Sequence, residues 1–323
     1  MKKTLIVAAV SALAAGSALA QSSVTLYGRV NVTAERQNTN GTKVYRLVND
    51  ASRWGVKGTE DLGGGLKAGF QLESGFAVDT GVVSGAFFGR QSEVNLSGGF
   101  GKVRLGNFFS EAYYATADYI SNHNHDTGPS SDALYAYVGR NTNKIAYRLP
   151  TFVKDLSIEG AVSAGEGAAN TIRSYDFAVN YGLGPLEFGF GAERNDKKEQ
   201  YAFRVSGGFG PVGFGAYVQR DKEGYNAFNG ATLTAARSMG NRTTVRLSGM
   251  YTLGASEFHV NVGKAGKYSK VNDSSAKQYT LGYNYNLSKR TKVYTYYTKV
   301  DDSKAAIYGG DFNSIAFGVR HNF

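Results

Sequence analysis

Basic side chains stand at alternate positions in segments whose other positions are apolar. Arg53 and Lys57 share one face of such a segment, and the apolar Trp54 lies on the other face. Arg29 and Arg320 have the same setting in two further segments. Guanidinium and ammonium groups in this arrangement carry out no covalent chemistry by themselves, but they sort ions by charge. The pattern therefore predicts an electrostatic function.

Residues that could catalyse a reaction or bind a metal are sparse. His123 and His125 stand next to Asp126, but no third or fourth ligand follows at a matched spacing. None of the 4 histidines has a nucleophile motif nearby. Gly63-Gly64-Gly65 lacks the Lys-Ser/Thr pair and the helix of a phosphate-binding loop, so it is expected to form a turn. We expect no enzyme, no metal and no cofactor.

The first residues have the features of a secretory signal peptide. Two lysines precede the apolar stretch Leu5–Ala15, and Ala18-Leu19-Ala20 supplies a small-residue cleavage pattern. The apolar stretch is shorter than the roughly 20 residues that a membrane-spanning helix needs. We expect residues 1–20 to be cleaved and residues 21–323 to form a single exported domain.

Period-two alternation between turn residues predicts an all-β chain. We expect sixteen strands, at Ser23–Glu35, Ser52–Asp61, Leu66–Ala77, Phe87–Ser97, Lys102–Phe108, Arg140–Leu149, Leu156–Gly165, Arg173–Leu183, Pro185–Asn195, Glu199–Phe209, Pro211–Asp221, Arg242–Leu253, Glu257–Ala265, Lys277–Leu287, Thr291–Asp301 and Asn313–Phe323.

The connectors between these strands alternate in length. Short turns such as Gly63-Gly64-Gly65 follow one set of strands, whereas long polar segments follow the other, including Gln37–Asp50, Asp221–Asn241, Gly266–Ala276 and Asp302–Phe312. Short turns at one rim and long loops at the other are typical of a transmembrane antiparallel β-barrel. Closure of the barrel removes the unpaired backbone edge, which lipid does not tolerate.

Composition agrees with a barrel in a bacterial outer membrane. The chain has 22 Tyr and 19 Phe, and the mean hydropathy of −0.31 fits strands with one watery face. There is no cysteine, so no disulfide stabilises the exported protein. The formal net charge is +10, but the basic residues are spread singly through the strands. Nucleic acid is therefore not an expected partner.

Several segments resemble the general diffusion porins of Gram-negative bacteria, and most closely the trimeric porins of beta-proteobacteria. They are Leu26-Tyr27-Gly28-Arg29, the hairpin from Ser52 to Glu73, Leu96-Ser-Gly-Gly-Phe-Gly-Lys-Val-Arg-Leu-Gly106, Leu287-Ser-Lys-Arg-Thr291 and the terminal Phe323. The resemblance covers the mature chain. It implies a homotrimer in contact with outer-membrane lipid and lipopolysaccharide, with Phe323 as the terminus used for membrane insertion.

The resemblance also implies that the third loop folds inward and narrows the pore. This loop is the long connector from Phe109 to Gly139, whose acidic residues would face a basic wall. Glu111 and Asp118 are the candidate acids. Arg29 matches the basic position of the first strand, and Arg140 matches the one where the chain re-enters the barrel. A third arginine is replaced by Asn107 in Leu-Gly-Asn.

The expected function is a water-filled channel through which small hydrophilic solutes and ions diffuse passively, with a mild preference for anions. Strand phase adds Arg53, Lys57 and Arg320 to Arg29 and Arg140 in the basic wall. An arginine on the lipid face near mid-bilayer would cost roughly 2–4 kcal/mol, so these side chains are placed inward. Three alternatives stay open: an adhesin or surface scaffold, a barrel-wall hydrolase, and a channel specific for phosphate or an organic anion.

Overall fold

One antiparallel sheet forms the body of the molecule. The computed structural model describes residues 23–118, 134–165, 173–224 and 238–323. Its elements are β1 (Ser23–Thr39), β2 (Thr42–Asn49), β3 (Arg53–Gly63), β4 (Leu66–Gly75), β5 (Gln91–Gly98), β6 (Gly101–Asn107), α2 (Glu111–Tyr113), the π-helical turn η1 (Tyr114–Asp118), β7 (Lys144–Arg148), β8 (Leu156–Ser163), β9 (Ser174–Leu183), β10 (Leu186–Asn195), β11 (Lys198–Phe209), β12 (Val212–Lys222), β13 (Asn241–Leu253), β14 (Ser256–Ala265), β15 (Ala276–Asn286), β16 (Thr291–Asp302) and β17 (Phe312–Asn322).

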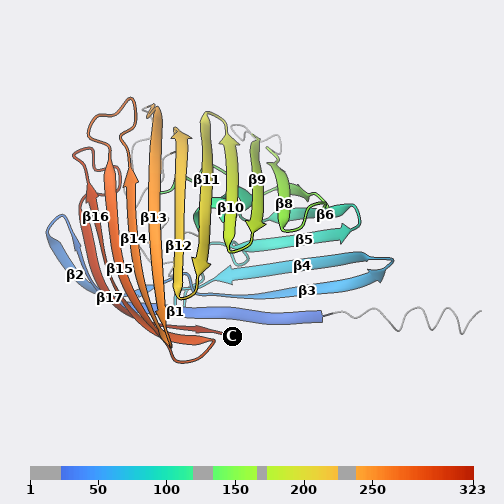
Figure 1. Ribbon diagram of the computed structural model, residues 1–323, viewed down its shortest axis with the longest axis horizontal. Coiled ribbons are helices and arrows are strands. Elements are labelled where there is room, and N and C mark those ends of the chain that lie inside the picture. The colour runs from blue at the N-terminus through green and yellow to red at the C-terminus, as the bar shows by residue number, and fades with distance from the viewer. Residues whose placement is uncertain (1–22, 119–133, 166–172, 225–237) are drawn as a thin grey trace, which may run out of the picture.

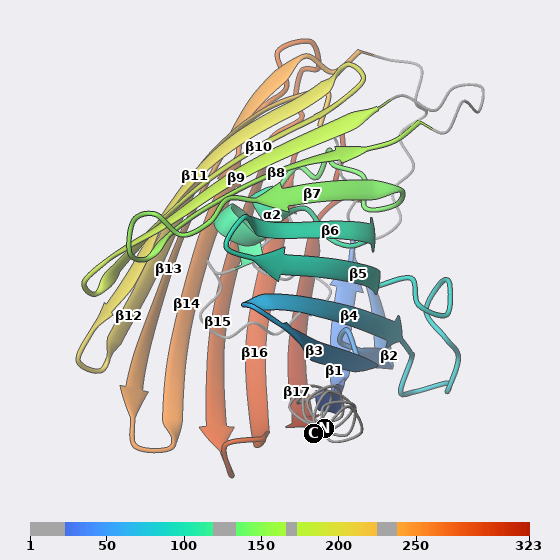
Figure 2. The same cartoon turned by 90° about the vertical axis from the view of Figure 1, so that its right-hand side faces the viewer.

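The sheet curls round until its last strand meets its first (Figures 1 and 2). Residues Ser23–Arg29 of β1 pair with β3 on one side, and residues Arg29–Thr39 pair with β17 on the other. Within the described ranges β2 pairs with β1 alone, so sixteen strands close the barrel, as the sequence predicts. Within these ranges no helix is long and apolar enough to cross a membrane.

The strand β2 is a correction to the sequence prediction, which treated Gln37–Asp50 as a long polar loop. Asn40 and Gly41 both have positive φ, 49° and 90°, and they join β1 to β2 as a two-residue hairpin. An Asn-Gly pair is the strongest short-range hairpin signal, because both residues tolerate the left-handed conformation that the turn requires. The first loop is therefore a β-hairpin.

Two strand boundaries also differ from the prediction. β5 begins at Gln91 and β7 at Lys144, whereas the alternation predicted strands from Phe87 and Arg140. Asn143, just before β7, has a φ of 54°, which breaks the extended conformation at that point. The stretches before both strands consequently belong to loops.

Burial along the strands is inverted relative to a protein with an apolar core. In β11 the aromatic Tyr201 and Phe203 are 52% and 46% exposed, whereas Gln200 and Arg204 are 0% and 2% exposed. The same alternation recurs in β13 and β17. Apolar side chains thus cover the outside of the barrel and polar side chains fill the inside, which is the arrangement that lipid favours.

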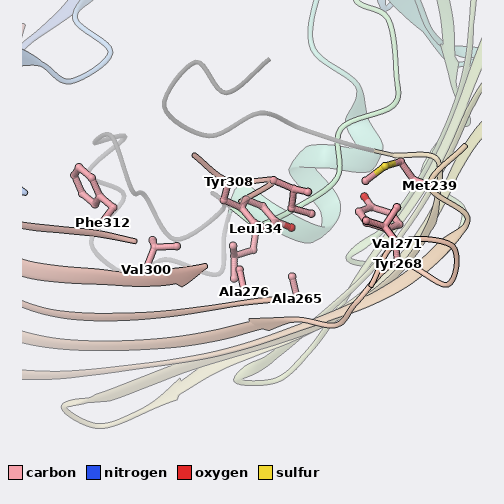
Figure 3. Packing of buried hydrophobic residues seen from close by; sticks show 10 residues of the cluster. Leu134, Met239, Ala265, Tyr268, Val271, Ala276, Val300, Tyr308 and Phe312 are labelled. Atoms are coloured by element: carbon pink, nitrogen blue, oxygen red, sulfur yellow. The ribbon is translucent and has the colours of Figure 1, made fainter. Parts of the chain in front are cut away.

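The two rims differ in their connections. Tight turns such as that at Gly64, where φ is positive, close one rim. Most connections at the other rim are longer, but those between β1 and β2 and between β10 and β11 have only two residues each, Asn40-Gly41 and Asp196-Lys197. At this loop rim Leu134 of the third loop belongs to a hydrophobic cluster (Figure 3). The other members come from the connections β12–β13, β14–β15 and β16–β17 and from the adjoining strand ends; they are Met239, Ala265, Tyr268, Val271, Ala276, Val300, Ile307, Tyr308 and Phe312.

β1 and the last residue of the sequence close the turn rim. The N–H of Gly28 donates to the carbonyl of Phe323, and the N–H of Phe323 donates to the carbonyl of Gly28, both at 3.0 Å. A side chain at Gly28 would overlap the Phe323 ring. The absence of a Cβ at Gly28 therefore lets the terminal aromatic lie flat against β1.

Candidate functional site: the inward loop and the facing wall

The third loop turns into the barrel immediately after β6. Ser110 caps the short helix α2, because its hydroxyl accepts a hydrogen bond from the N–H of Ala112 at 3.1 Å. α2 and η1 contact the inner face of β9, β10 and β11 (Figure 2). The expected inward fold of this loop is present, although the alternation in the sequence gave no sign of the helical turns.

Side chains of the wall form hydrogen bonds with the backbone of the loop. Glu193 of β10 accepts hydrogen bonds from the N–H groups of Val138 and Gly139, each at 3.2 Å. Gln219 of β12 accepts from the Ala136 N–H at 2.8 Å and donates to the Ala136 carbonyl at 2.9 Å. These bonds fix the returning half of the loop on the same wall as α2.

A group of charged side chains fixes the outgoing half. The Glu111 carboxylate lies 2.9 Å from Arg148 and 3.8 Å from Arg104, and both arginines also pair with Glu159. Burial raises the pKa of Glu111. Glu111 thus pairs with arginines of β6 and β7, the two strands that the third loop connects, and not with Arg29 or Arg53. Whether Glu111 also acts on ions in the constriction stays a prediction.

Three of the expected basic residues share the opposite wall. Arg29 of β1 is the cross-strand partner of Arg53 on β3, and on its other side it pairs with Asn322 of β17. Arg320 lies two residues from Asn322 on the same face. Register therefore places Arg53 and Arg29 side by side on adjacent strands, and Arg320 diagonally from Arg29 on the next strand. These three residues are called the arginine row. Lys57 continues the row towards the turn rim, where its ammonium lies 5.3 Å from the centre of the Tyr27 ring.

A hollow of about 210 Å³ separates this wall from the loop. Arg53 and Arg90 line one side of it, and Asp118 of the loop lines the other. The remaining lining residues are Ala51, Phe109, Tyr113, Tyr114 and Tyr137. The Asp118 carboxylate accepts a hydrogen bond from the Tyr113 hydroxyl at 3.0 Å. One loop acid and two wall arginines therefore face the same space.

A single carboxylate is shared between the two arginines. Glu73 lies 2.6 Å from the Nε of Arg90 and 3.9 Å from the Nε of Arg53, and it also accepts a hydrogen bond from the Tyr27 hydroxyl at 3.0 Å. The guanidinium of Arg90 lies 5.8 Å from the centre of the Phe109 ring, at the start of the loop. Two arginines and one carboxylate therefore lie together on this side of the hollow.

Arg90 escaped the sequence prediction because of the misplaced boundary of β5. If the strand began at Phe87, alternation would place Arg90 on the lipid face, since Glu93 lies on the inner face. Because β5 begins at Gln91, Arg90 belongs to the preceding loop and turns inward to Glu73. The clue available in the sequence was Gly89, which can end a regular strand.

Arg140 lies apart from the arginine row. Its guanidinium donates to the carbonyl oxygens of Ser163 and Ala164, at 3.1 and 2.6 Å, where β8 ends at the loop rim. These bonds tie the end of the third loop to the next loop. Whether Arg140 also acts on passing ions stays a prediction, as do the pore roles of the other basic residues and the insertion role of Phe323.

The two histidines of the described ranges, His259 and His321, each have a polar partner of their own. His259 is buried and contacts Asn284 and Glu257, and His321 contacts the hydroxyl of Thr291 near the turn rim. In the described ranges no three metal-ligating side chains form a group. His123 and His125 lie outside these ranges.

Comparison with known proteins identifies the family. A family model described as Gram-negative porin matches residues 7–305. The chain belongs to the Gram-negative porins. It therefore forms a channel in the outer membrane, and the porins are a family of channels, not of enzymes.

Relatives and solved structures agree with this assignment. The porin is 33% identical to outer membrane porin protein 32 of Delftia acidovorans, and the match covers 100% of both chains. An anion-selective porin from Comamonas acidovorans matches with a TM-score of 0.77 and 28% identity, over 94% of this chain and 100% of the other. OmpF of Salmonella typhi, at 16% identity, shares the fold with a TM-score of 0.73, over 93% of this chain and 97% of the other.

Proposed function

We propose that this porin lets small hydrophilic solutes and ions diffuse through the hollow between the third loop and the arginine row, with a mild preference for anions. The observation that carries the proposal is the hollow itself, where Arg53 and Arg90 share Glu73 and face Asp118. The similar Comamonas acidovorans porin is described as anion-selective, which supports the sign of the preference.

The mechanism needs only charge and size. Charges of opposite sign on the two sides of the neck produce a transverse field. Arg53 and Arg90 balance Glu73 and Asp118, and the further basic residues of the same wall, Arg29, Arg320 and Lys57, make the potential in the neck positive. An anion gains about 1 kcal/mol in such a wet site, which corresponds to roughly a fivefold preference. Salt screens the interaction, so the preference falls as ionic strength rises.

The reversal potential of the purified porin in a salt gradient across a planar bilayer tests the proposal. We expect the sign of an anion-selective pore, and we expect Asp118→Asn to shift the potential further in that direction, because this change removes a negative charge from the neck. Glu60→Gln, which removes the same charge from an exposed position near the turn rim, is the control. Clear cation selectivity of the parent protein contradicts the proposal.

The same recordings separate the alternatives. A protein that served mainly as a surface scaffold would be silent, and a channel with a solute site for phosphate or an organic anion would show conductance that saturates with that solute. We expect open, unsaturated conductance. A detergent assay with ester substrates tests the barrel-wall hydrolase, and we expect no turnover.

Further proposals concern assembly and export. We propose that the porin is a homotrimer that contacts lipid and lipopolysaccharide through its apolar outer face, where side chains such as Leu247 and Phe317 are 64% and 63% exposed. Three conductance steps per insertion event would support the trimer. Residues 1–20 lie outside the described ranges, and we propose that they are a signal peptide. N-terminal sequencing of the mature protein, with Gln21 expected first, tests the cleavage site.

A further inference from the structure

The inner face of β10 lacks side chains where the loop helix crosses it. Gly189 and Gly191 both point inward, since their cross-strand partners Arg204, Ala178 and Ala202 are buried on the inner face. A Cβ on Gly191 would lie 2.5 Å from the carbonyl oxygen of Ala112, and one on Gly189 would overlap the carbonyl oxygen of Ala115. Main chain therefore rests directly on main chain at these two positions.

The loop contributes small alanine side chains to this contact. Ala112 and Ala115 are 0% exposed, and Ala117 is 1% exposed. The Nε of Arg204, on the neighbouring strand β11, donates a 2.7 Å hydrogen bond to the Ala115 carbonyl. This bond fixes the height of the helix along the strand, while the glycines fix its distance from the wall.

We propose that Gly189 and Gly191 are positioning residues that set how far the third loop projects into the channel, and so determine the width of the pore. The inference rests on the proposed function, in which this loop narrows the channel. A methyl group on either glycine meets a backbone oxygen, which cannot rotate away, so the helix itself must move. Movement away from β10 carries the helix into the channel, towards the hollow lined by Arg53, Arg90 and Asp118.

A series of side chains of increasing size tests the proposal. We expect single-channel conductance to fall from the parent to Gly191→Ala and further to Gly191→Val, with the size limit for neutral sugars falling in parallel. Gly189→Ala should act in the same direction. Gly191→Ala is the milder of the two alanine changes, and it keeps the test available if Gly189→Ala does not fold.

The control is Gly282→Ala on β15. Gly282 also faces inward, opposite His259 and Tyr296, but its nearest neighbour would be a side-chain carbon at an ordinary 3.5 Å. We expect it to leave conductance at the parent value. Heat-dependent gel mobility verifies in each case that the barrel is folded. A general loss of folding would lower the number of channels, whereas the proposal predicts a lower conductance of each channel.

Crystal structures of the alanine variants separate this inference from the proposed function. A helix displaced towards the hollow with reduced conductance supports both. A displaced helix with parental conductance overturns the proposed role of the loop as the constriction. An undisplaced helix with parental conductance overturns the role of the glycines.

Discussion

Glu73 decides how much positive charge the wall presents to the hollow. Its carboxylate lies within ion-pair distance of both Arg53 and Arg90, and it bonds Tyr27 as well. Alternation in the sequence placed Arg53 on the inner face. It could not show that Arg90, beyond the end of a strand, would complete the pair, because alternation holds only inside a regular strand.

Glu73→Gln is expected to strengthen the preference for anions. Glutamine keeps a hydrogen-bond acceptor for Tyr27 but removes the negative charge between the arginines. The permeability ratio of chloride to potassium should rise up to about fivefold at low salt, for a change of about 1 kcal/mol. The reversal potential measures this ratio, with Glu60→Gln again as the control. A fall in the ratio would show that Glu73 acts by holding the arginines in place.

At the scale of elements, the third loop depends on contacts that no pattern in its own sequence announces. Its length and lack of alternation predicted a loop, and the resemblance predicted that it folds inward. The acids show the limit of this reasoning. Asp118 reaches the hollow, whereas Glu111 lies seven residues earlier on the wall side of the helical turns and pairs with Arg148. Alternation could not tell which acid faces the channel, because a segment expected to be irregular has no predictable phase.

The ion pair between Glu111 and Arg148 makes loop anchoring sensitive to pH. In Arg148→Met the Glu111 carboxylate loses its nearest cation, which we expect to destabilise the barrel by roughly 1–3 kcal/mol at pH 7. Burial raises the pKa of Glu111, so in the folded protein this carboxyl takes up a proton more readily than usual. The penalty should therefore be small in acid and grow as pH rises through the raised pKa.

Thermal unfolding in detergent at several pH values measures this effect. Arg194→Met is the matched control, because Arg194 is 67% exposed and its distance to Glu199 is 3.8 Å. Such an exposed pair contributes less than about 1 kcal/mol and should show no comparable trend. Equal penalties for Arg148→Met in acid and at neutral pH would refute the anchoring role of the pair.

At the scale of the whole molecule, the fold was largely predictable. Sixteen strands, alternate short and long connections and an apolar outside all follow from period-two alternation, because each strand separates lipid from water by itself. The hairpin of β2 was missed although Asn40-Gly41 announces it, and the contacts between loop and wall were missed because they join residues far apart in the sequence. Register in a closed sheet sets those contacts, and local patterns do not contain it.

The inverted burial predicts how the barrel responds to charge on its outer face. Leu247 lies in the middle of β13 and is 64% exposed, directly after the buried Arg246. Leu247→Arg should destabilise the folded barrel in lipid by roughly 2–4 kcal/mol, whereas Leu253→Arg, at the end of the same strand, should cost about 0–1 kcal/mol. Urea titration of folding into lipid vesicles compares the two. Equal costs would contradict a lipid-embedded outer face.

Glu193, Gln219 and Arg204 each form hydrogen bonds with peptide groups of the loop. A peptide group is common to every amino acid, so these hydrogen bonds do not depend on which side chains the loop carries, unlike the ion pair of Glu111 with Arg148. Loop side chains that face the channel could be replaced without breaking these hydrogen bonds to the loop backbone. The barrel can therefore stay constant while the channel-facing residues of the third loop change. Such changes would alter which ions or solutes pass most readily.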